Sequence, residues 1–407
     1  MSWKRRVVIS SMGMISPLGD APGRILESLK AGRVQFRPSS VDPDVVVCPV
    51  ESFHPRSFLG PCKDSRYLNR GALLAAAAAM TAIRECGIPE HERSHAGLFV
   101  GVGPNLDIGG EFPNVQEGKL DRPALQALWI LRFLPNTAAS VISKLAQIHG
   151  ENLTVSTACA ASLQAVGEGF RRIRDGYLDL AFVGGGDSRL SPGGILAYKK
   201  AQALCVGISP PDRAMRPFDR DRAGFVPGEG GAFFLLEELE HARKRNARIL
   251  AEIRGYGSSL DGHSMTAPDG EGRGARKAVG RALEEAQIKP AEIDVIFAHG
   301  TSTPLNDEVE AHLIEELYPG GSPPVVALKS WMGHMASACG ALELGITLLC
   351  MKEKYLPRIR NLRTPCNPRV RFLTSDLSLP FRTGILENFG FGGQNAALVI
   401  RRYEPDE

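Results

Sequence analysis

Short apolar runs recur along the chain, and most of them end at a glycine or another turn-forming residue. Glycine supplies 44 of the 407 residues, which exceeds the ~7% of an average protein. Between the runs lie stretches with helical spacing, such as Leu163, Val166, Phe170 and Ile173 at steps of three and four. This alternation predicts an α/β fold with a largely buried mixed sheet. The runs that we expect to be strands are 7–9, 96–102, 180–183, 232–236, 293–298, 325–328 and 396–400.

The order of these features occurs twice, which indicates an internal duplication. Each copy has a strand that runs into a glycine-containing turn, then a second strand ending in glycine, then a strand leading into a helix, and finally a glycine-rich segment. We therefore expect two similar α/β halves, at 1–249 and 250–407, whose loops face one another. The paired segments are 7–17 with 251–260, 96–103 with 294–301, 153–170 with 325–350, and 179–188 with 386–400.

Composition and charge exclude several classes of protein. Hydrophobic residues make up 43% of the chain and charged residues 23%, and 48 basic side chains stand against 45 acidic ones, for a net charge of +3. Such a chain is neither disordered nor strongly basic, so we expect no nucleic-acid partner. The longest apolar stretch, 71–80, is shorter than the ~20 residues of a membrane span, and the basic first residues lead into no secretory signal. We therefore predict a cytoplasmic protein without a membrane span.

The eight cysteines form no C-x-x-C pair and none of the spacings that build zinc sites. Thiols at this density in a long chain fit a reducing compartment, in which most of them are buried as small hydrophobic side chains. We therefore expect no metal site. The cysteines are Cys48, Cys62, Cys86, Cys159, Cys205, Cys339, Cys350 and Cys366.

Cys159 differs from the other cysteines because it stands in VSTACAAS, 155–162, between an apolar run and a helix that we expect to start near Ala160. The positive end of a helix dipole favours the thiolate, which is the nucleophilic form of cysteine. A thiol with a pKa of about 8.5 is only a few per cent ionised at pH 7. A partly buried helix terminus supplies up to ~2 kcal/mol, enough to bring that thiol to half ionisation. Cys159 is therefore the candidate nucleophile.

Two histidines stand at similar junctions. His299 lies in FAHGTSTP, 297–304, at the end of an apolar run, and His334 closes ALKSWMGH, 327–334, just before an apolar helix expected at 335–351. Rigid elements often carry active-site residues at such junctions. We therefore expect His299 and His334 to join Cys159 in one site, and we interpret the remaining histidines as ordinary core or surface groups.

At these residues the sequence resembles the β-ketoacyl-acyl-carrier-protein synthases, the condensing enzymes of the thiolase fold. The resemblance covers nearly the whole chain and follows the elongating branch, which has two catalytic histidines. It implies an α/β, thiolase-like fold: two duplicated halves with mixed sheets in a layered α-β-α-β-α arrangement. The matching motifs are STACA at 156–160, GFVPGEGG at 224–231, HGTSTPLND at 299–307, KSWMGH at 329–334 and NFGFGGQN at 388–395.

The resemblance also implies an activity, the decarboxylative Claisen condensation of an acyl thioester with malonyl-acyl carrier protein in fatty acid or polyketide elongation. Cys159 would receive the acyl chain. His299 and His334 would hydrogen-bond the malonyl thioester carbonyl and stabilise the enolate that decarboxylation releases. The backbone N–H groups of Cys159 and Phe391 would form the oxyanion hole, and Phe391 would gate the acyl pocket.

Further residues follow from the same resemblance. Lys329, with Glu310, would support the two histidines from behind, and Asp307 lies in the same motif. Thr301 and Thr303 would bond the phosphopantetheine arm. The resemblance implies no cofactor bound to this chain, because the acyl groups arrive on the 4′-phosphopantetheine of acyl carrier protein.

Three positions depart from the family pattern. Gln394 stands where the family usually has threonine, and Ser11 stands at a usual glycine. Pro104 to Asp107 (PNLD) is interpreted as an insertion next to the glycine loop 101–103, whose neighbour often shapes the acyl pocket in the family. These departures leave the length of the acyl chain and the choice between fatty acid and polyketide synthesis open.

Two other functions remain to be compared with the main one. A chain-length-factor-like partner, which shapes chains without forming an acyl-enzyme, is disfavoured because such partners usually lack the nucleophile, whereas Cys159 is present. A ketosynthase subunit of a type II polyketide or aryl polyene system, working with a chain-length factor, stays open. The first reading implies a homodimer and the second a heterodimer.

Acyl carrier proteins are acidic, so their docking surface should be basic. Lys63, Arg66 and Arg70 have helical spacing just before the alanine-rich segment 72–79, and we expect Arg132 to lie nearby. We expect these four residues to form the docking surface.

Overall fold

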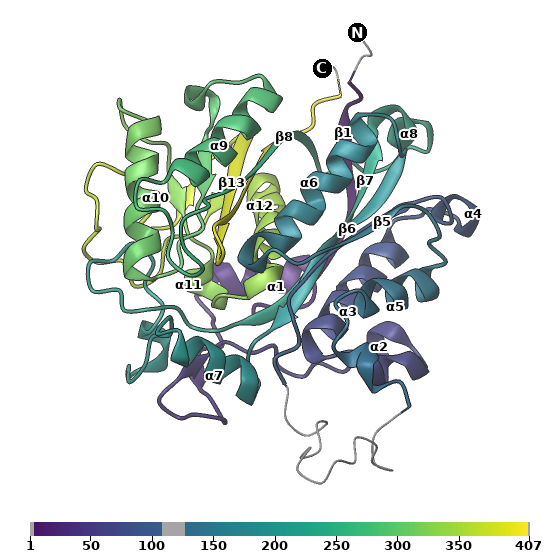
Figure 1. The fold of residues 1–407 in the computed structure, drawn as a ribbon. Helices are drawn as coiled ribbons and strands as arrows, with labels where there is room; N and C mark the ends of the chain where they lie inside the picture. Colours follow the sequence, from purple (N-terminus) through teal and green to yellow (C-terminus); the bar gives the residue numbers. More distant parts are fainter. Residues whose placement is uncertain (1–3, 108–126, 406–407) are drawn as a thin grey trace.

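The computed structural model describes residues 4–107 and 127–405 of the chain (Figure 1). The elements of the first half are β1 (Val7–Ile15), α1 (Pro22–Lys30), β2 (Arg37–Pro38), β3 (Val46–Val47), α2 (Pro55–Leu59), α3 (Arg70–Glu85), α4 (Glu90–Arg93), β4 (Gly97–Val102), α5 (Thr137–Ala146), β5 (Asn152–Val155), α6 (Ala161–Arg174), β6 (Leu180–Ser188), α7 (Pro192–Lys200), β7 (Glu229–Glu238) and α8 (Leu239–Lys244). Those of the second half are β8 (Ala251–Leu260), α9 (Arg273–Ala286), β9 (Val295–Phe297), α10 (Pro304–Leu317), β10 (Val325–Val326), α11 (Lys329–Met332), α12 (Cys339–Glu353), β11 (Tyr355–Leu356), β12 (Leu377–Ser378), β13 (Thr383–Gly390) and β14 (Gln394–Arg401). Each apolar run expected to be a strand contributes to one.

The main sheet repeats one topology on its two sides. Its order is β10-β9-β13-β14-β8-β1-β7-β6-β4-β5. Counted outward from the centre, each side has two antiparallel strand pairs followed by two parallel strand pairs. The two sides are β1-β7-β6-β4-β5 and β8-β14-β13-β9-β10. All strands of the first set precede residue 250, and all strands of the second set follow it.

One of the four expected segment pairs is wrong in detail. We matched 179–188 with 386–400, but β6 corresponds to β13, and β7 corresponds to β14. The glycine-rich turn between β13 and β14 made one hairpin look like a single unit, so the sequence comparison merged two strands into one.

The two sets of strands form a continuous sheet, whereas the resemblance implied separate sheets. The connection is short: only Val7–Ile9 of β1 pair with Ala251–Ile253 of β8, in antiparallel register. In the described part of the chain β1 and β8 pair only at these residues, and helices fill the space between the two sets.

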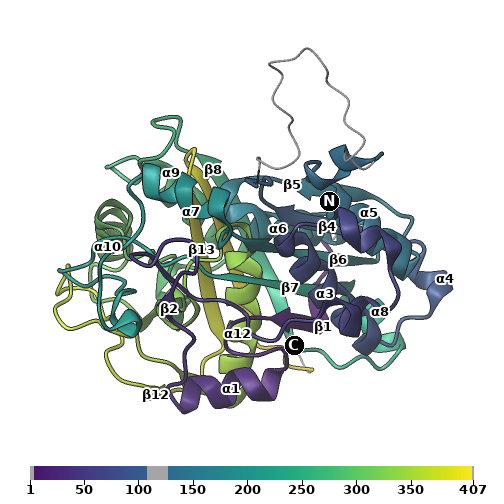
Figure 2. The same ribbon diagram turned by 90° about the horizontal axis from the view of Figure 1, so that it is seen from below.

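The layers alternate helix and sheet, as expected (Figure 1). Helices α6 and α12 lie between the two sets of strands and supply much of the central apolar cluster. Helices α3 and α5 cover the outer face of the first set, and α9 and α10 that of the second. Figure 2 shows the layers from below, with α9 and α10 on one side, α3 and α5 on the other, and α6 and α12 between them. The first-half elements α7 and β2 lie on the side of α9 and α10. This is the layered α-β-α-β-α arrangement of the thiolase-like fold.

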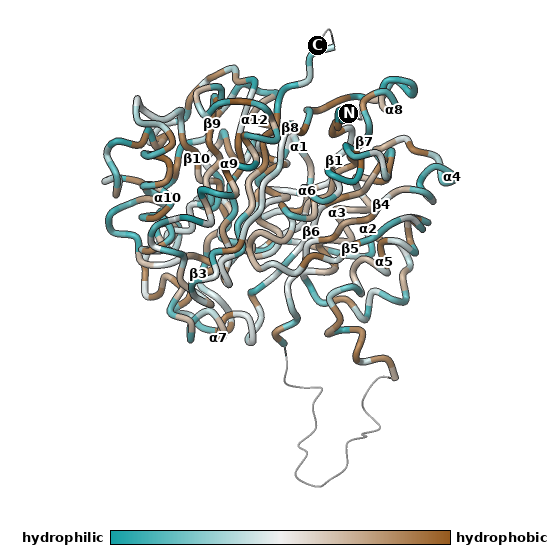
Figure 3. The backbone as a smooth tube through the Cα atoms, turned by 45° about the horizontal axis from the view of Figure 1, so that its top comes forward, coloured by the Kyte–Doolittle hydropathy of each residue, from teal (hydrophilic) through white to brown (hydrophobic). Residues whose placement is uncertain are grey.

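Hydropathy follows the layers. In Figure 3 the brown, hydrophobic segments gather in the interior, whereas peripheral elements such as α4 are hydrophilic. Every residue of α12 from Cys339 to Met351 is buried, which explains why this stretch has no polar face. No helix in the described part of the chain is long and apolar enough to cross a membrane.

Candidate active site

The two central helices begin at matching turns, and a candidate residue lies in or just before each turn. Cys159 lies in the short 3-10 turn Ala158–Ala160 before α6, and His334 precedes the 3-10 turn Ala336–Ala338 before α12. Ala158 and Ala336 have φ values of 48° and 44°, a left-handed conformation that costs energy for a residue with a Cβ. Such strain persists where the surrounding structure enforces it, often at functional sites.

The structure brings Cys159, His299 and His334 together. The Cys159 Sγ lies 3.3 Å from His334 Nε2, and the two imidazole rings are 5.6 Å apart and nearly perpendicular. A sulfur or nitrogen atom from each of the three residues lies within 4.8 Å of the others. All three side chains are buried, so their reacting atoms face one another away from bulk water.

His299 has its proton placed by its neighbours. Its Nδ1 lies 3.1 Å from Lys329 Nζ and 3.3 Å from Asn388 Nδ2. Both neighbours are donors, so Nδ1 accepts and the proton of the neutral ring belongs on Nε2. Burial, together with the charge of Lys329, lowers the pKa of His299 well below its ordinary value. His299 is therefore neutral at pH 7 and presents an Nε2–H donor.

His334 reaches the same state by other contacts. The backbone N–H of Ala336 donates to His334 Nδ1 at 3.0 Å, and the Cys339 Sγ lies 3.2 Å from the same nitrogen. The proton of the neutral ring is therefore on Nε2, which faces the Cys159 sulfur. Burial and the charge of Lys329 also lower the pKa of His334. The site thus holds two neutral imidazoles with the same tautomer.

Lys329 contacts His299, but its ion-pair partner is Glu343 and not Glu310. Lys329 Nζ donates to Glu343 Oε1 at 2.6 Å and to the His299 carbonyl oxygen at 2.6 Å, and Lys329 is completely buried. Burial lowers the pKa of Lys329, but Glu343, together with Cys339 and Glu310, more than offsets this effect, so the pKa is raised. The other oxygen of Glu343 accepts from Asn388 at 2.7 Å. Glu343 was missed, although a single acidic residue inside a buried apolar helix was a signal that could have indicated it.

Glu310 and Asp307 bind the backbone of the loop that carries His299. Glu310 accepts the N–H groups of His299 and Gly300 at 2.6 and 2.8 Å. Asp307 accepts the N–H group of Thr301 at 2.9 Å and also that of Ser302 at 3.0 Å. These two carboxyl groups therefore hold the loop in place, and neither replaces Glu343 as the partner of Lys329.

The Cys159 thiol is not ionised by the helix terminus as the sequence suggested. Burial raises the pKa of Cys159 to about 11, although the charge of Lys329 and a hydrogen bond from the Phe391 backbone N–H both lower it. The free energy of desolvation exceeds these favourable interactions because the side chain is only 8% exposed. The same Phe391 N–H group points at the sulfur, and Gly390 permits this approach, since a Cβ there would lie 2.9 Å from the Cys159 backbone nitrogen.

A pocket of about 320 Å³ opens onto these residues. Cys159 and both histidines lie in its wall, together with Phe391. Thr301 and Thr303 line it as well, and their hydroxyl oxygens are 2.8 Å apart. The pocket therefore joins the reactive atoms to a polar wall that a hydrophilic arm can contact.

Comparisons with known proteins identify the family of this chain. Residues 4–242 match the N-terminal domain of beta-ketoacyl synthases, and residues 250–363 match their C-terminal domain. The chain belongs to the beta-ketoacyl synthase family. The 3-oxoacyl-[acyl-carrier-protein] synthase 2 of Coxiella burnetii (strain RSA 493 / Nine Mile phase I) is 33% identical over 415 residues, which cover 98% of this chain and 99% of that protein. This ketosynthase is therefore an acyltransferase enzyme.

Solved structures agree with this assignment. A beta-ketoacyl synthase from Burkholderia phymatum STM815 has a TM-score of 0.89 and 30% identity, and the match covers 98% of this chain and 100% of that one. The ishigamide ketosynthase/chain length factor has a TM-score of 0.86 and 31% identity, with coverage of 98% and 100%. The thiolase-like fold expected from the resemblance is confirmed.

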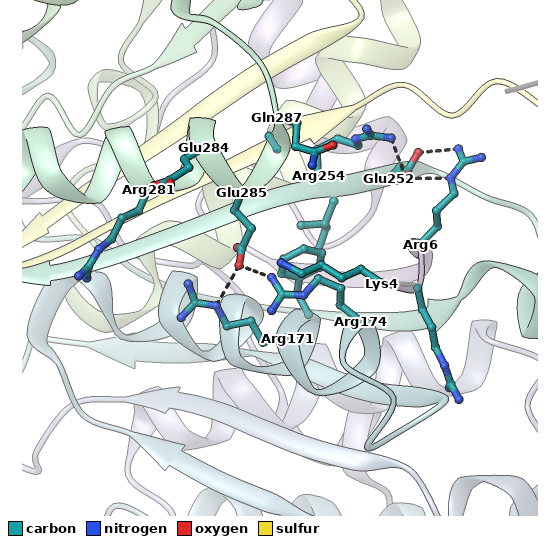
Figure 4. A pocket seen from close by; sticks show the side chains of 14 residues that line it. Lys4, Arg6, Arg171, Arg174, Glu252, Arg254, Arg281, Glu284, Glu285 and Gln287 are labelled. Atoms are coloured by element: carbon teal, nitrogen blue, oxygen red, sulfur yellow. Dashed lines mark hydrogen bonds and ion pairs between the residues drawn. The ribbon is translucent and has the colours of Figure 1, made fainter. Parts of the chain in front are cut away.

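A larger cavity of the ketosynthase, about 820 Å³, lies at the other end of α6. A helix of 14 residues spans roughly 21 Å, so this cavity is well separated from Cys159. Figure 4 shows that ion pairs fill much of its wall, including Glu285 with Arg174 and Glu252 with Arg6. Its described lining includes no cysteine or histidine, so the reactive chemistry of the ketosynthase belongs to the smaller pocket.

The four expected docking residues do not share one helix. Lys63 and Arg66 lie in a 3-10 turn, Lys63–Tyr67, which ends before α3 begins at Arg70, so the predicted helical spacing is wrong. Lys63, Arg66 and Arg70 are all exposed, but the Arg70 guanidinium also binds the fully buried Glu229 carboxylate at 2.6 Å. Arg132 ends another 3-10 turn, Trp129–Arg132.

The buried pair of Lys329 and Glu343 gives a testable prediction. Removing one partner of a buried ion pair leaves an uncompensated charge, which typically costs ~3–5 kcal/mol. We expect Glu343→Ala to lower the free energy of unfolding of the ketosynthase by about that amount, measured by denaturant titration. Glu315→Ala is the matched control, because Glu315 pairs with the exposed Arg369 at the surface. Equal effects of the two substitutions would contradict the importance of the buried pair.

Proposed function

We propose that this enzyme condenses an acyl thioester with malonyl-acyl carrier protein, releasing carbon dioxide and forming a β-ketoacyl thioester. The observation that carries the proposal is the pair of neutral histidines beside the nucleophile: each has a ring nitrogen within 4.8 Å of the Cys159 sulfur, and that of His334 is Nε2. Such donors stabilise an oxyanion without first needing to lose or gain a proton.

In the first half-reaction, the Cys159 sulfur attacks the carbonyl carbon of an acyl-carrier thioester. The new bond joins the acyl group to Sγ, the bond to the carrier sulfur breaks, and the thiol proton ends on the leaving phosphopantetheine thiol. The backbone N–H groups of Cys159 and Phe391 stabilise the oxyanion of the tetrahedral intermediate. Because burial raises the pKa of Cys159 to about 11, the proton leaves as the sulfur attacks, and a resting thiolate is not required.

In the second half-reaction, malonyl-carrier loses carbon dioxide, and the electron pair of the broken C–C bond forms an enolate. Its oxygen accepts hydrogen bonds from His299 Nε2–H and His334 Nε2–H. One positioned donor of this kind contributes roughly 10²–10³ in rate. The enolate carbon then attacks the acyl carbonyl carbon, and the bond to Sγ breaks. The sulfur leaves as a thiolate, which takes a proton from water, and the product leaves on the carrier protein.

The proposed substrates bring their own prosthetic group. Thr301 and Thr303 are suited to hydrogen-bond the phosphopantetheine arm, since both hydroxyl groups line the pocket. Every proposed step uses side chains or backbone groups of this chain, so we propose no bound cofactor or metal. A cytoplasmic location remains a prediction.

A second candidate is the ketosynthase subunit of a polyketide or aryl polyene system. Similarity to the ishigamide ketosynthase/chain length factor favours it. Strand β5 also ends the sheet, and its Leu153 is 42% exposed. An exposed edge strand favours pairing with another chain, either a second copy or a related partner.

Substitutions can separate the two half-reactions. Cys159→Gln removes the nucleophile and places an amide near the acyl position, so condensation should stop while malonyl decarboxylation continues or rises. His299→Ala and His334→Ala should each depress decarboxylation, by roughly 10²-fold or more. Labelled carbon dioxide and condensation product are measured in parallel. A His334→Ala enzyme that decarboxylates at the full rate would show that this division of roles is wrong.

For docking, we propose that Lys63 and Arg66 contact the acidic carrier protein, with Arg132 nearby and Arg70 contributing its charge while bound to Glu229. Lys63→Glu with Arg66→Glu should weaken carrier binding and flatten its dependence on salt, because screened surface charges mainly govern encounter. Lys277→Glu, on the exposed side of α9, controls for a change of charge alone. Calorimetry at low and high salt gives the affinities, and an unchanged affinity of the double variant at low salt would refute the docking surface.

The state of assembly distinguishes the main function from the second candidate. We expect light scattering on the purified chain to give the mass of a dimer with condensing activity. Activity that depends on adding a chain-length-factor partner would favour the polyketide-type function. A stable and fully active monomer would contradict both.

A further inference from the structure

Cys339 is a buried thiol beside a catalytic histidine, and the mechanism above gives it no part. It is the first residue of α12 and is completely buried. Its sulfur lies 3.2 Å from His334 Nδ1. The other ring nitrogen, Nε2, lies 3.3 Å from the sulfur of Cys159. Each nitrogen of the His334 ring therefore contacts a thiol, and only one of these thiols is the nucleophile.

The surrounding groups determine which atom donates in the contact between Cys339 and His334. The Ala336 N–H group donates to Nδ1 at 3.0 Å, so Nδ1 carries no proton and can only accept. Burial raises the pKa of the Cys339 thiol well above its ordinary value, although the charge of Lys329 and a hydrogen bond from the Met335 backbone lower it. The thiol therefore keeps its proton at neutral pH, and its S–H group donates to Nδ1.

One face of α12 supports both histidines. Cys339 and Glu343 are four residues apart in this helix, so they lie on the same face, about one turn from each other. Glu343 binds Lys329, whose Nζ lies 3.1 Å from His299 Nδ1. Cys339 reaches His334 Nδ1 without an intermediate residue. The same helix face thus acts on the same ring atom of each histidine.

Cys339 also completes a pattern that the two rings share. Nδ1 of each ring lies within hydrogen-bond distance of two donors, which are Lys329 Nζ and Asn388 Nδ2 for His299, and the Ala336 N–H group and the Cys339 thiol for His334. Two donors from different directions fix the orientation of a ring better than one. They also polarise the ring, which strengthens its Nε2–H group as a donor. Without the thiol, His334 would keep only the backbone donor.

We propose that Cys339 is a positioning residue for His334, and that its S–H group, together with the Ala336 N–H group, holds the ring so that Nε2–H points at the enolate oxygen. This inference rests on the proposed condensing function. The position of the ring matters most in malonyl decarboxylation, in which His334 donates directly to the reacting group. Acylation of Cys159 uses backbone N–H groups for its oxyanion and therefore depends less on this thiol.

The test compares the two half-reactions in Cys339→Ala. Release of labelled carbon dioxide from malonyl-carrier protein measures decarboxylation, and intact-protein mass spectrometry after incubation with an acyl-carrier thioester measures acylation of Cys159. We expect kcat for decarboxylation to fall about fivefold, the typical effect of losing one neutral hydrogen bond, with KM for malonyl-carrier protein unchanged. Acylation should stay close to the rate of the unaltered enzyme. An unchanged kcat for decarboxylation would overturn the proposal.

A control and a rescue separate positioning from packing. Cys350→Ala removes the same atoms from another completely buried cysteine of α12, roughly 16 Å further along the helix, and should leave both half-reactions unchanged. Cys339→Ser keeps a hydroxyl donor and should recover most of the decarboxylation rate that Cys339→Ala loses. Equal losses in the two alanine variants, or no recovery by serine, would assign Cys339 a packing role and refute the proposal.

A nitrogen NMR spectrum of histidine-labelled enzyme tests the same contact without turnover, with His334→Ala to assign the resonances. His334 should appear as the Nε2–H tautomer. In Cys339→Ala its Nδ1 resonance should move to higher frequency, because an acceptor nitrogen that loses a hydrogen bond is less shielded. An unmoved resonance in a folded variant, or an Nδ1–H tautomer in the unaltered enzyme, would overturn the inference.

Failure of the proposed function would give a different result. An unaltered enzyme that shows the Nε2–H tautomer and the shift in Cys339→Ala, but neither acylates Cys159 nor decarboxylates malonyl-carrier protein, would refute the condensing function and leave the contact between Cys339 and His334 established.

Discussion

The buried ammonium group of Lys329 holds the catalytic site together. It contacts the Nδ1 and carbonyl oxygen of His299 and the carboxylate of Glu343, and Asn388 closes the network by binding both Glu343 and His299. A charge in this position is stable only because it is paired and hydrogen-bonded. The same contacts determine which nitrogen of His299 carries the proton, so the ion pair that stabilises the core also sets the chemistry of the pocket.

Burial has opposite consequences for the three reactive side chains. It raises the pKa of the Cys159 thiol and lowers the pKa of both histidines, because a charged form is disfavoured wherever water is excluded. All three groups are therefore neutral at rest. Charge develops only during reaction, and N–H donors that are already oriented then stabilise it without reorganisation.

The duplicated topology explains how residues from distant parts of the chain meet. Helices α6 and α12 occupy equivalent positions in the two halves. Cys159 lies in the turn that leads into α6, and His334 lies just before the turn that leads into α12. Because both helices lie in the central layer, their N-termini come together at one end of it. A hydrogen bond from the Ser337 N–H group to Asp187 crosses the same boundary.

The sequence by itself determined the alternation of strands and helices, the internal repeat, and the positions of Cys159, His299 and His334 at element ends, because these features depend on neighbouring residues. It did not identify Glu343 as the partner of Lys329, since Glu310 and Glu343 are both acidic residues near the catalytic motifs and only the packing of α12 separates their roles. Spacing placed Arg70 on a shared helical face, but tertiary structure pairs it with the buried Glu229. The pKa of Cys159 likewise required the tertiary structure, because desolvation is set by groups that are distant in sequence and adjacent only in the folded chain.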